Sequence, residues 1–235
     1  MAVNRHFHES TRDRLRRLRP FAELEDVALD RLAGLSRILH MERKATLYAE
    51  GEAYRGMFVV LEGLVVVHRS SEDGRMLILD VCRPGDSFSE VPLFEEGEAG
   101  YPASARATRS SEVLFLPKKR FVPFLKQHPE VAWEMLRDFA AKMKEMSLRL
   151  EGVTLREVAS RVARYLLREV EAGGAEGEEQ PMLTLPLTKG SVASYLGTAH
   201  ETLSRTFARL IREKIVAVQG RKVTILDREK LERLV

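Results

Sequence analysis

The sequence is poor in cysteine and in long apolar runs, and each scarcity excludes a class of protein. The single cysteine, Cys82, cannot form an internal disulfide or supply a four-cysteine iron–sulfur cluster. The longest apolar runs, such as Met57–Leu61, have the length of a strand and fall far short of the roughly 20 residues that a membrane-spanning helix needs. The N-terminal segment is polar and lacks the apolar core of a signal peptide. We therefore expect a soluble, cytoplasmic protein with no membrane partner.

Charge of one sign is not in large excess either. The formal net charge is +3 at pH 7, which permits nucleic-acid binding without indicating it. Arginines gather in the first twenty residues, and we interpret them as side chains on the solvated face of a helix. A second basic set lies in Arg205–Lys214. A chain of 235 residues with 44% hydrophobic residues is long and apolar enough for one large domain or two ordinary ones.

The first half of the chain changes from a helical pattern to a β pattern. Leu24–Leu39 has apolar residues at helical spacing and predicts a short helix. From Thr46 to Leu116 short apolar runs are separated by glycines, which is typical of an antiparallel sandwich or barrel. Cys82 closes one of these runs, so we expect it to be a buried strand residue, and Glu72–Gly74 has the composition of a hairpin turn. The expected strands are Met57–Leu61, Leu64–His68, Met76–Cys82, Ala103–Thr108 and Val113–Leu116.

A heptad pattern follows Pro129. Apolar residues recur from Ala132 with alternating steps of four and three, which favours a parallel two-helix dimer over a helix packed only on its own domain. Gly152 interrupts the pattern, and Thr154–Glu157 has the form of a capping box that opens a new helix, so we expect a hinge there. The residues predicted to form the dimer interface are Leu136, Phe139, Met143, Met146, Leu150 and Val153.

The C-terminal part combines helices and short strands. An amphipathic helix is expected over Arg156–Glu171 and a strand over Pro181–Leu187. The next helix begins near Thr188 and ends at Gly197, and a second capping box, Thr198–Glu201, opens another helix after a very short turn. Ala193, Gly197 and Leu203 stand four, eight and fourteen residues after Lys189, as the small residue, turn glycine and apolar anchor of a helix-turn-helix should.

The second helix of this motif, Ala199–Lys214, has an apolar face and a polar face. The predicted inward residues are Leu203, Phe207, Leu210 and Ile211. Arginine can pair with guanine, glutamate can accept from cytosine, and serine or a longer basic residue can bind phosphate. Ile215–Leu226 then predicts a hairpin wing that turns at Gly220, and a last helix starts at Asp227. The expected DNA contacts are Thr198, His200, Glu201, Ser204, Arg205, Arg209, Arg221 and Lys222.

These features together resemble the CRP/FNR family of bacterial regulators. The resemblance lies in His200–Arg205 with the basic wing after it, in the turn Arg83–Asp86, and in Tyr101–Ala105. It implies an α+β fold: an N-terminal antiparallel β-roll (a double-stranded jelly roll), a long dimerisation helix and a C-terminal winged helix-turn-helix. The implied domains are a sensing domain at 1–126, the dimerisation helix and hinge at 127–154, and the DNA-binding domain at 155–235. The resemblance further implies a homodimer that binds double-stranded DNA, responds to a small-molecule or gas effector, and has RNA polymerase as a candidate partner.

Within this family the outward residues Glu201, Ser204 and Arg205 are similar to the FNR type. Catabolite activators instead have glycine at the position of Ser204 and arginine at that of His200. The resemblance therefore implies palindromic DNA sites with TTGAT-like half-sites. It places the chain closest to the branch with FNR, DNR and HcpR. His200 departs from the family pattern, which leaves the reading of the outer base pair open.

The effector is left open by these residues. Cyclic-AMP-binding relatives carry a Gly-Glu pair and an Arg-Ser pair, whereas this chain has Ser89 before Glu90 and Tyr101-Pro102, which argues against a cyclic nucleotide. What remains resembles haem-linked nitric-oxide sensors or redox and stress regulators without a known ligand. The resemblance places the effector near Ser89, Glu90, Ser104, Met143 and Ser147. Axial haem ligands would come from His6, His8, His40, His68, His128, Met143 or Met146.

Three alternatives compete with an effector-responsive regulator that is not an enzyme. A catabolite-activator-type regulator would depend on a cyclic nucleotide, and the residues at Ser89 and Tyr101 argue against binding of that ligand. A cupin-type metalloenzyme needs a His-x-His motif on a strand, but the only such motif, His6 and His8, precedes the β-rich segment. The cupin hypothesis also leaves the winged helix unexplained. A cyclic-nucleotide-binding regulatory module of a kinase or channel is disfavoured by the altered cassette at Ser89 and Tyr101 and by the lack of membrane-spanning segments.

Overall fold

The computed structural model describes residues 10–71, 76–97, 99–173, 178 and 180–235, which fold into two compact units. The first unit comprises the residues up to Arg69 together with Leu79–Ala141, and the second comprises Ser70–Ile78 with Lys142–Val235. The architecture is the predicted α+β arrangement of antiparallel sheets, a long helix and a C-terminal helix-turn-helix. The predicted domains 1–126, 127–154 and 155–235 do not coincide with these two units, and this division remains a prediction.

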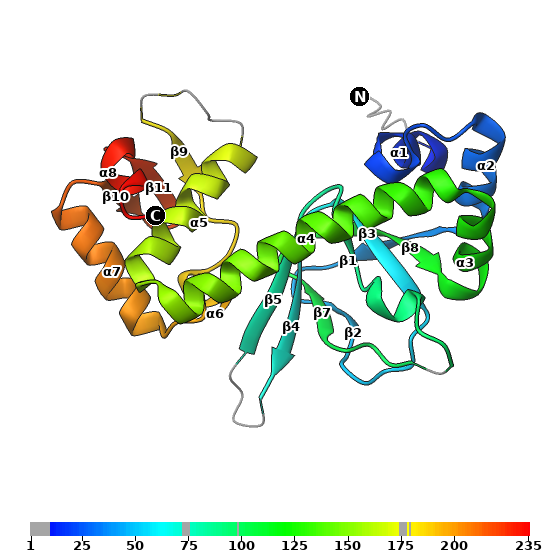
Figure 1. Cartoon of the computed structure of the whole chain (residues 1–235), viewed down its shortest axis with the longest axis horizontal. Helices are drawn as coiled ribbons and strands as arrows, with labels where there is room; N and C mark the ends of the chain where they lie inside the picture. Colours follow the sequence, from blue (N-terminus) through cyan, green and yellow to red (C-terminus); the bar gives the residue numbers. More distant parts are fainter. Residues whose placement is uncertain (1–9, 72–75, 98, 174–177, 179) are drawn as a thin grey trace, which may run out of the picture. The chain divides into compact units, whose positions relative to one another are not determined.

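Helices cover one side of the first unit. They are α1 (Thr11–Arg17), the short 3-10 helix η1 (Arg19–Phe21), α2 (Asp26–Leu35) and α3 (Lys118–Gln127). In Figure 1, α1 and α2 are blue and α3 is green. Their apolar faces form a core with Met57, Leu114 and Leu116 of the sheet. The predicted helix over Leu24–Leu39 is therefore too long. It ends at Leu35, because Ser36 takes an extended conformation and the next residues enter a strand.

Two antiparallel four-stranded sheets form the β-roll, one in the order β1-β8-β3-β6 and the other in the order β2-β7-β4-β5 (Figure 1). Val65 pairs with Ala107 in one sheet and Arg37 with Phe115 in the other. Gly63 links two consecutive strands with φ +95°, a backbone region that favours glycine, and a Cβ there would collide with Ser111. The strands are β1 (Arg37–Met41), β2 (Thr46–Tyr48), β3 (Gly56–Glu62), β4 (Val65–Ser70), β5 (Met76–Cys82), β6 (Ser87–Phe88), β7 (Ser104–Ala107) and β8 (Ser111–Pro117).

Each of the five predicted strands is present. The bounds of β5 are as predicted, and the ends of the other four shift by one or two residues. Cys82 is buried in β5, as expected. The strands β1, β2 and β6 were not predicted. The predicted turn at Glu72–Gly74 lies outside the described residues.

The long helix α4 runs without a break from Pro129 to Leu155, so the predicted end at Gly152 is wrong. The capping box at Thr154–Glu157 is also wrong. The Thr154 hydroxyl donates back to the carbonyls of Leu150 (2.9 Å) and Glu151 (3.2 Å), as serine and threonine do inside helices. Glu157 is the N-cap of α5 (Val158–Ala172), and it makes no side-chain capping bond. The helix thus continues through glycine, and the chain bends only at Arg156–Glu157.

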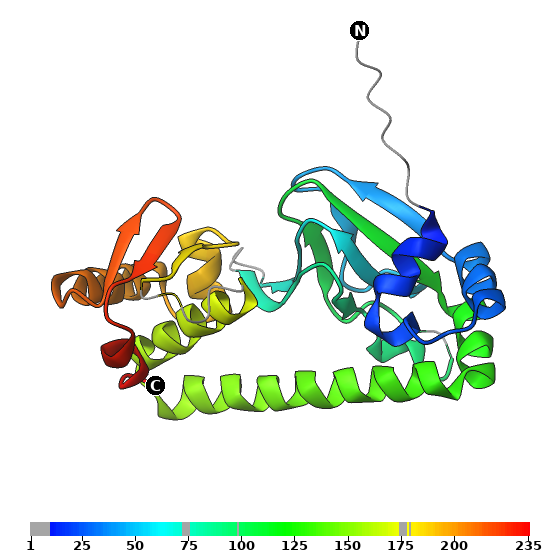
Figure 2. The same ribbon diagram turned by 90° about the horizontal axis from the view of Figure 1, so that it is seen from above.

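The second unit is a winged helix (Figure 2). Its sheet has the order β10-β11-β9, with a hairpin formed by β10 and β11. Its core contains Val162, Leu166, Leu203, Leu210 and Val223, all of them fully or almost fully buried. The elements after α5 are β9 (Met182–Thr184), α6 (Lys189–Tyr195), α7 (His200–Arg212), β10 (Val216–Gln219), β11 (Lys222–Ile225) and α8 (Arg228–Glu232).

Candidate nucleic-acid interface and associated surfaces

The helix-turn-helix is formed by α6 and α7. Thr188 caps α6 by accepting a hydrogen bond from the Ser191 N–H (3.2 Å). Gly197 follows the helix with φ +62°, and the next N–H, of Thr198, returns to the carbonyl of Ala193 (3.0 Å). Ala193 is 2% exposed where the two helices pack. The three features predicted from the spacing are therefore present, and the turn is short enough to fix the direction of α7.

The start of α7 differs from the prediction. Ala199, in an extended conformation, is the N-cap, and no side chain caps the helix, so the capping box at Thr198–Glu201 is wrong. The side chain of Glu201 forms an ion pair with Arg205 one turn later (3.2 Å). Both are more than 70% exposed, and such a pair contributes only about 0.5 kcal/mol to stability. Glu201 is thus free of any capping role and lies on the outer surface.

One face of α7 is buried and the other is exposed. Leu203, Phe207 and Leu210 point into the core, as predicted, and Thr206 joins them. Ile211 is 44% exposed, so its assignment to the inward face is wrong. Arg209 is held by Glu213 one turn later (3.0 Å).

The predicted DNA-contacting residues gather at the start of α7. Glu201, Ser204 and Arg205 are exposed and, at spacings of three and four residues, share one face of the helix. His200 is exposed beside them, and Thr198 is half-buried in the turn. This surface presents an acceptor, a hydroxyl and a bidentate donor, which is the set that reads base edges in a major groove.

The wing carries the other two predicted contacts. Gly220, with φ +62°, turns the hairpin between β10 and β11. The guanidinium of Arg221 donates to the carbonyls of Leu185 (Nε, 2.9 Å) and Pro186 (Nη2, 2.7 Å), so it ties the wing to the segment before α6. Lys222 is exposed on the hairpin. Of the pair, Lys222 is the side chain better placed for a phosphate.

An apolar stripe runs along the exposed side of α4. It consists of Leu136 (57% exposed), Met143 (71%), Met146 (66%), Leu150 (67%) and Val153 (48%). Phe139 differs from these residues because it is half-buried against the core of its own unit, where its ring meets Phe94 edge-on at 6.0 Å. Five of the six residues predicted to form the dimer interface therefore belong to this exposed stripe, and Phe139 does not.

Of the predicted effector residues of the first unit, Ser89 and Glu90 follow β6, and Ser104 begins β7 in the other sheet. Ser89 has φ +63°, its hydroxyl meets that of Tyr48, and its carbonyl accepts from Tyr54 Oη (2.7 Å). Glu90 is 6% exposed and accepts a hydrogen bond from Ser87 Oγ (2.6 Å). Ser104 accepts from the Glu50 N–H (2.9 Å). Met143 and Ser147, the other two, are exposed on the part of α4 that belongs to the second unit.

An aromatic cluster that the sequence analysis missed fills the space around Ser89. Tyr101 stacks on Tyr48 with ring centroids 3.7 Å apart, and Tyr48 also stacks on Phe58 (5.5 Å). Tyr101 Oη donates to the Gly56 carbonyl (3.0 Å). Burial raises the pKa of Tyr48, Tyr54 and Tyr101, so their hydroxyls stay neutral. These rings are far apart in the sequence. The pairing of β2 with β7 and the backbone bond from the Gly51 N–H to the Tyr101 carbonyl (2.9 Å) bring Tyr48 and Tyr101 together.

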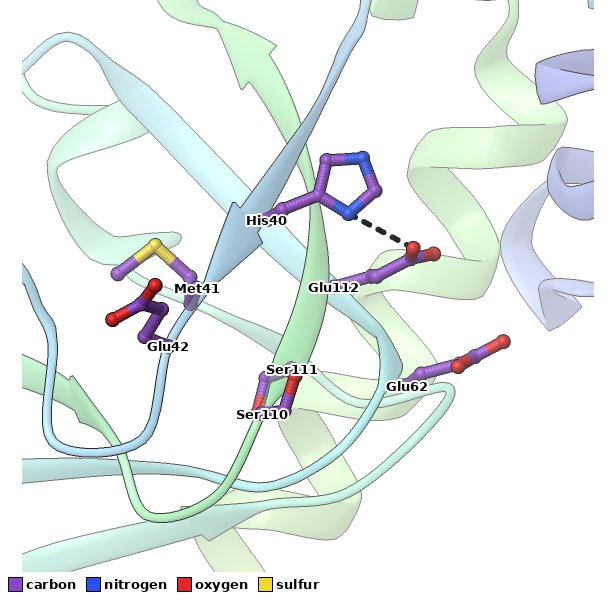
Figure 3. Close-up of a pocket in the computed structure, with 7 residues that line it drawn as sticks. All are labelled: His40, Met41, Glu42, Glu62, Ser110, Ser111 and Glu112. Carbon is purple, nitrogen blue, oxygen red and sulfur yellow. Dashed lines mark ion pairs between the residues drawn. The ribbon is translucent and has the colours of Figure 1, made fainter.

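The candidate haem ligands are scattered. His40 pairs with Glu112 (2.9 Å) at an open pocket of about 310 Å³ that is lined by acidic and hydroxyl side chains (Figure 3). His128 stacks on Phe124 and pairs with Glu130 (3.0 Å). His68 is half-buried, its Nδ1 has no partner in the part of the chain that the structure describes, and burial lowers its pKa. His6 and His8 lie outside the described residues, and among those described no three His, Cys, Asp or Glu side chains form a group suited to a metal ion.

Comparisons with known proteins cover nearly the whole chain. Residues 38–128 match the cyclic nucleotide-binding domain, and residues 160–234 match the Crp-like helix-turn-helix domain. A CRP-like cAMP-activated global transcriptional regulator of Mycobacterium tuberculosis is 26% identical over 215 residues, which cover 91% of this chain and 94% of the relative.

Solved structures agree on the fold. FixK2 from Bradyrhizobium japonicum has a TM-score of 0.73 at 22% identity and covers 85% of this chain and 96% of its own. A CooA variant from Carboxydothermus hydrogenoformans has a TM-score of 0.74 at 21% identity, with 90% of each chain covered. Within the described part of the chain, none of the helices has the length and apolar character that crossing a membrane requires.

Proposed function

The chain belongs to the CRP/FNR family of DNA-binding transcription regulators, and from that premise we propose that it acts as a homodimer reading a palindromic site through two copies of α7. The family consists of regulators with an effector-binding domain rather than of enzymes. The observation that carries the proposal is the exposed face of Glu201, Ser204 and Arg205 at the start of α7. In a helix-turn-helix this end of the second helix enters the major groove.

The apolar stripe of α4 supports the dimer. Large apolar side chains that stand half to three-quarters exposed along one helix need a partner surface, and here they recur with the four-three spacing of a two-helix coiled coil. The matching surface is the same stripe on a second copy of the chain. A dimer formed in this way has two-fold symmetry, as a palindromic DNA site does.

We propose FNR-like half-sites of the TTGAT type for this reader. Arg205 can bind the guanine O6 and N7 of the half-site, and Glu201 can accept from the cytosine N4 on the opposite strand. The ion pair between these two side chains holds them next to each other before DNA binds. His200 replaces the arginine of catabolite activators, so we expect the outer base pair to be read weakly.

For the β-roll we propose an effector other than a cyclic nucleotide. The M. tuberculosis relative is described as cAMP-activated, but here Tyr48, Tyr54 and Tyr101 fill the space around Ser89. Haem has little support from the described residues. His40 and His128 are each paired with a glutamate, and Met143 and Met146 lie in the apolar stripe. His68 has an Nδ1 without a partner among the described residues, and burial lowers its pKa. An absorption spectrum with native mass spectrometry of the purified protein would reveal either a Soret band or a bound organic molecule.

Fluorescence anisotropy on labelled duplexes tests the reader. The duplexes carry a palindrome of TTGAT half-sites with centres about 10 base pairs apart, the same palindrome with the guanine and cytosine of each half-site exchanged, and a scrambled sequence. We expect the palindrome to bind on the order of 1,000-fold more tightly than the scrambled duplex at physiological salt. Equal affinity for all three duplexes would contradict a sequence-specific reader. RNA polymerase is a candidate partner that the same duplexes can test by co-migration.

A further inference from the structure

The carbonyl groups at the end of α6 are held by arginines from two other helices of the second unit. Arg161 of α5 donates from Nη1 to the carbonyls of Leu196 and Gly197, the latter at 3.2 Å. Arg149 of α4 donates from Nη2 to the carbonyl of Tyr195 (3.3 Å). The last carbonyls of a helix lack partners within the helix and form the negative end of its dipole. Two guanidinium groups thus bind the end of α6 where its field favours them.

Arg161 is enclosed by backbone on two sides. Its side-chain stem touches the backbone of α4 at Gly152, where a Cβ would stand 3.5 Å from Arg161 Cγ. Its Nη1 lies beside Gly197, where a Cβ would stand 3.5 Å away. The Nε atom is buried and has no hydrogen-bond partner among the described residues. Burial lowers the pKa of Arg161, although an arginine stays charged at neutral pH. The hydrogen bonds to the carbonyls of Leu196 and Gly197, together with the approach to Gly152, place Arg161 between α4 and the turn.

Tyr195 provides a second connection at the same end of α6. Its ring lies under the guanidinium of Arg149, with 4.1 Å between the guanidinium carbon and the ring centroid. Its hydroxyl donates to Glu145 of α4 (3.1 Å) and accepts from Arg168 of α5 (2.7 Å). Glu145 and Arg168 also form an ion pair. Tyr195 is 5% exposed, so this network is largely shielded from water.

We propose that Arg161 and Arg149 are positioning residues that lock the helix-turn-helix to the end of α4 and so set the distance between the two copies of α7 in the dimer. The inference rests on the proposed homodimeric, palindrome-reading function. Only Thr198 and Ala199 separate Gly197 from α7, so fixing the carbonyls of Tyr195, Leu196 and Gly197 fixes the entry into the reading helix. Each α7 reads its own bases with residues on its outer face, but the spacing of two readers depends on how rigidly each is held to α4.

The test separates spacing from base reading. Arg161→Met keeps an aliphatic side chain against Gly152 and removes the hydrogen bonds to the carbonyls of Leu196 and Gly197. Arg161→Lys restores a positive charge that can bond one of these two carbonyls. Arg164→Met is the matched control, because Arg164 lies one turn further along α5 and makes no hydrogen bond or ion pair within the described part of the chain. Each protein is titrated with the palindrome, with the palindrome carrying one extra central base pair, and with a single half-site in matched and exchanged forms.

We expect the wild-type protein and Arg164→Met to bind the lengthened palindrome at least about 10-fold more weakly than the palindrome. Arg161→Met should reduce that preference to within about 3-fold, Arg161→Lys should fall between, and all should discriminate matched from exchanged half-sites equally well. A wild-type spacing preference in Arg161→Met would overturn the proposal. So would a loss of half-site discrimination, which would show that Arg161 only maintains the fold. Failure of the wild-type protein to prefer any palindrome would instead contradict the proposed function itself.

Discussion

Tyr101 lies face to face with Tyr48 in the β-roll, with ring centroids 3.7 Å apart and ring planes 13° apart. Tyr48 in turn bonds Ser89. In the resemblance to cyclic-AMP-binding relatives, Ser89 takes the position of a glycine and Tyr101 that of an arginine. The position of the phosphate-binding arginine is therefore taken by a neutral ring that stacks on Tyr48, and the position of the glycine by a serine that bonds the same Tyr48. Burial raises the pKa of both tyrosines, so neither changes charge near neutral pH.

This stack predicts that the protein does not bind cyclic AMP or cyclic GMP at millimolar concentration. A nucleotide would have to displace buried aromatic area and bring an anion to a place without the family's arginine. Isothermal titration and thermal melting should both show no effect, whereas a ligand at 100 times its Kd would stabilise the fold by about 2.7 kcal/mol. A saturable titration with a Kd in the micromolar range would contradict the prediction.

Ser89 combines an unfavourable backbone with a useful side chain, and two substitutions separate these effects. Its φ of +63° costs a residue other than glycine about 1 kcal/mol, and its bond to Tyr48 contributes a similar amount. Ser89→Gly should relieve the strain and lose the bond, which leaves the free energy of unfolding nearly unchanged. Ser89→Ala should keep the strain and lose the bond, which costs about 1–2 kcal/mol in urea denaturation. Equal stability of the two variants would show that the backbone at this position is not strained.

The sequence predicted the elements whose signals are local. Glycine-bounded apolar runs identified β3, β4, β5, β7 and β8, and the spacing of Ala193, Gly197 and Leu203 identified the helix-turn-helix. Both capping boxes failed, for different reasons. Thr154 bonds backwards to its own helix, and Ala199 rather than Thr198 is the N-cap of α7.

The features that the sequence did not reveal depend on contacts between distant segments. The stack of Tyr48 on Tyr101 depends on the pairing of β2 with β7 and on the backbone bond between Gly51 and Tyr101, and nothing in either local sequence indicates it. The contact of Arg161 with the end of α6 depends in the same way on the packing of α5 against the turn. Phe139 fits the heptad spacing, yet it is half-buried in its own unit and its ring contacts Phe94 edge-on. Phe94 is distant in the sequence, so the heptad pattern could not indicate this contact.

The apolar stripe predicts that Met146→Glu disrupts the dimer. A carboxylate in a two-helix seam would lie unpaired beside its symmetry mate, which costs several kcal/mol per dimer. Sedimentation velocity should then show a monomer with a folded circular dichroism spectrum, and its affinity for the palindrome should fall to that of a half-site. Lys144→Glu, an exposed position of α4 outside the stripe, is the control and should stay dimeric. A dimer in both variants would place the interface elsewhere.

Two glycines of the second unit should respond in opposite directions to alanine. At Gly152, inside α4, a Cβ would meet Arg161 at an ordinary contact distance of 3.5 Å, so Gly152→Ala should stabilise the helix by up to about 1 kcal/mol. At Gly197 the φ of +62° and a Cβ only 3.1 Å from Val153 Cγ2 should make Gly197→Ala cost about 1–2 kcal/mol. Thermal melting of the two variants measures both effects. Destabilisation by Gly152→Ala would mean that α4 does need to bend at that residue.

Arg205 and Arg209 lie four residues apart on α7, and we predict different roles for them. Arg205 pairs with the exposed Glu201 and lies near the start of the helix, so it can exchange that partner for a guanine. Arg205→Ala should cost about 1–3 kcal/mol on the matched palindrome and much less on the version with exchanged bases. Arg209 is paired with Glu213 and lies further along the helix, so Arg209→Ala should weaken binding to both duplexes equally and lower the salt dependence. Anisotropy titrations of both variants on both duplexes at several salt concentrations distinguish the roles. If Arg205→Ala weakened both duplexes to the same degree, Arg205 would be a phosphate contact, and the base reading proposed for the half-site would have to come from Glu201 and Ser204 alone.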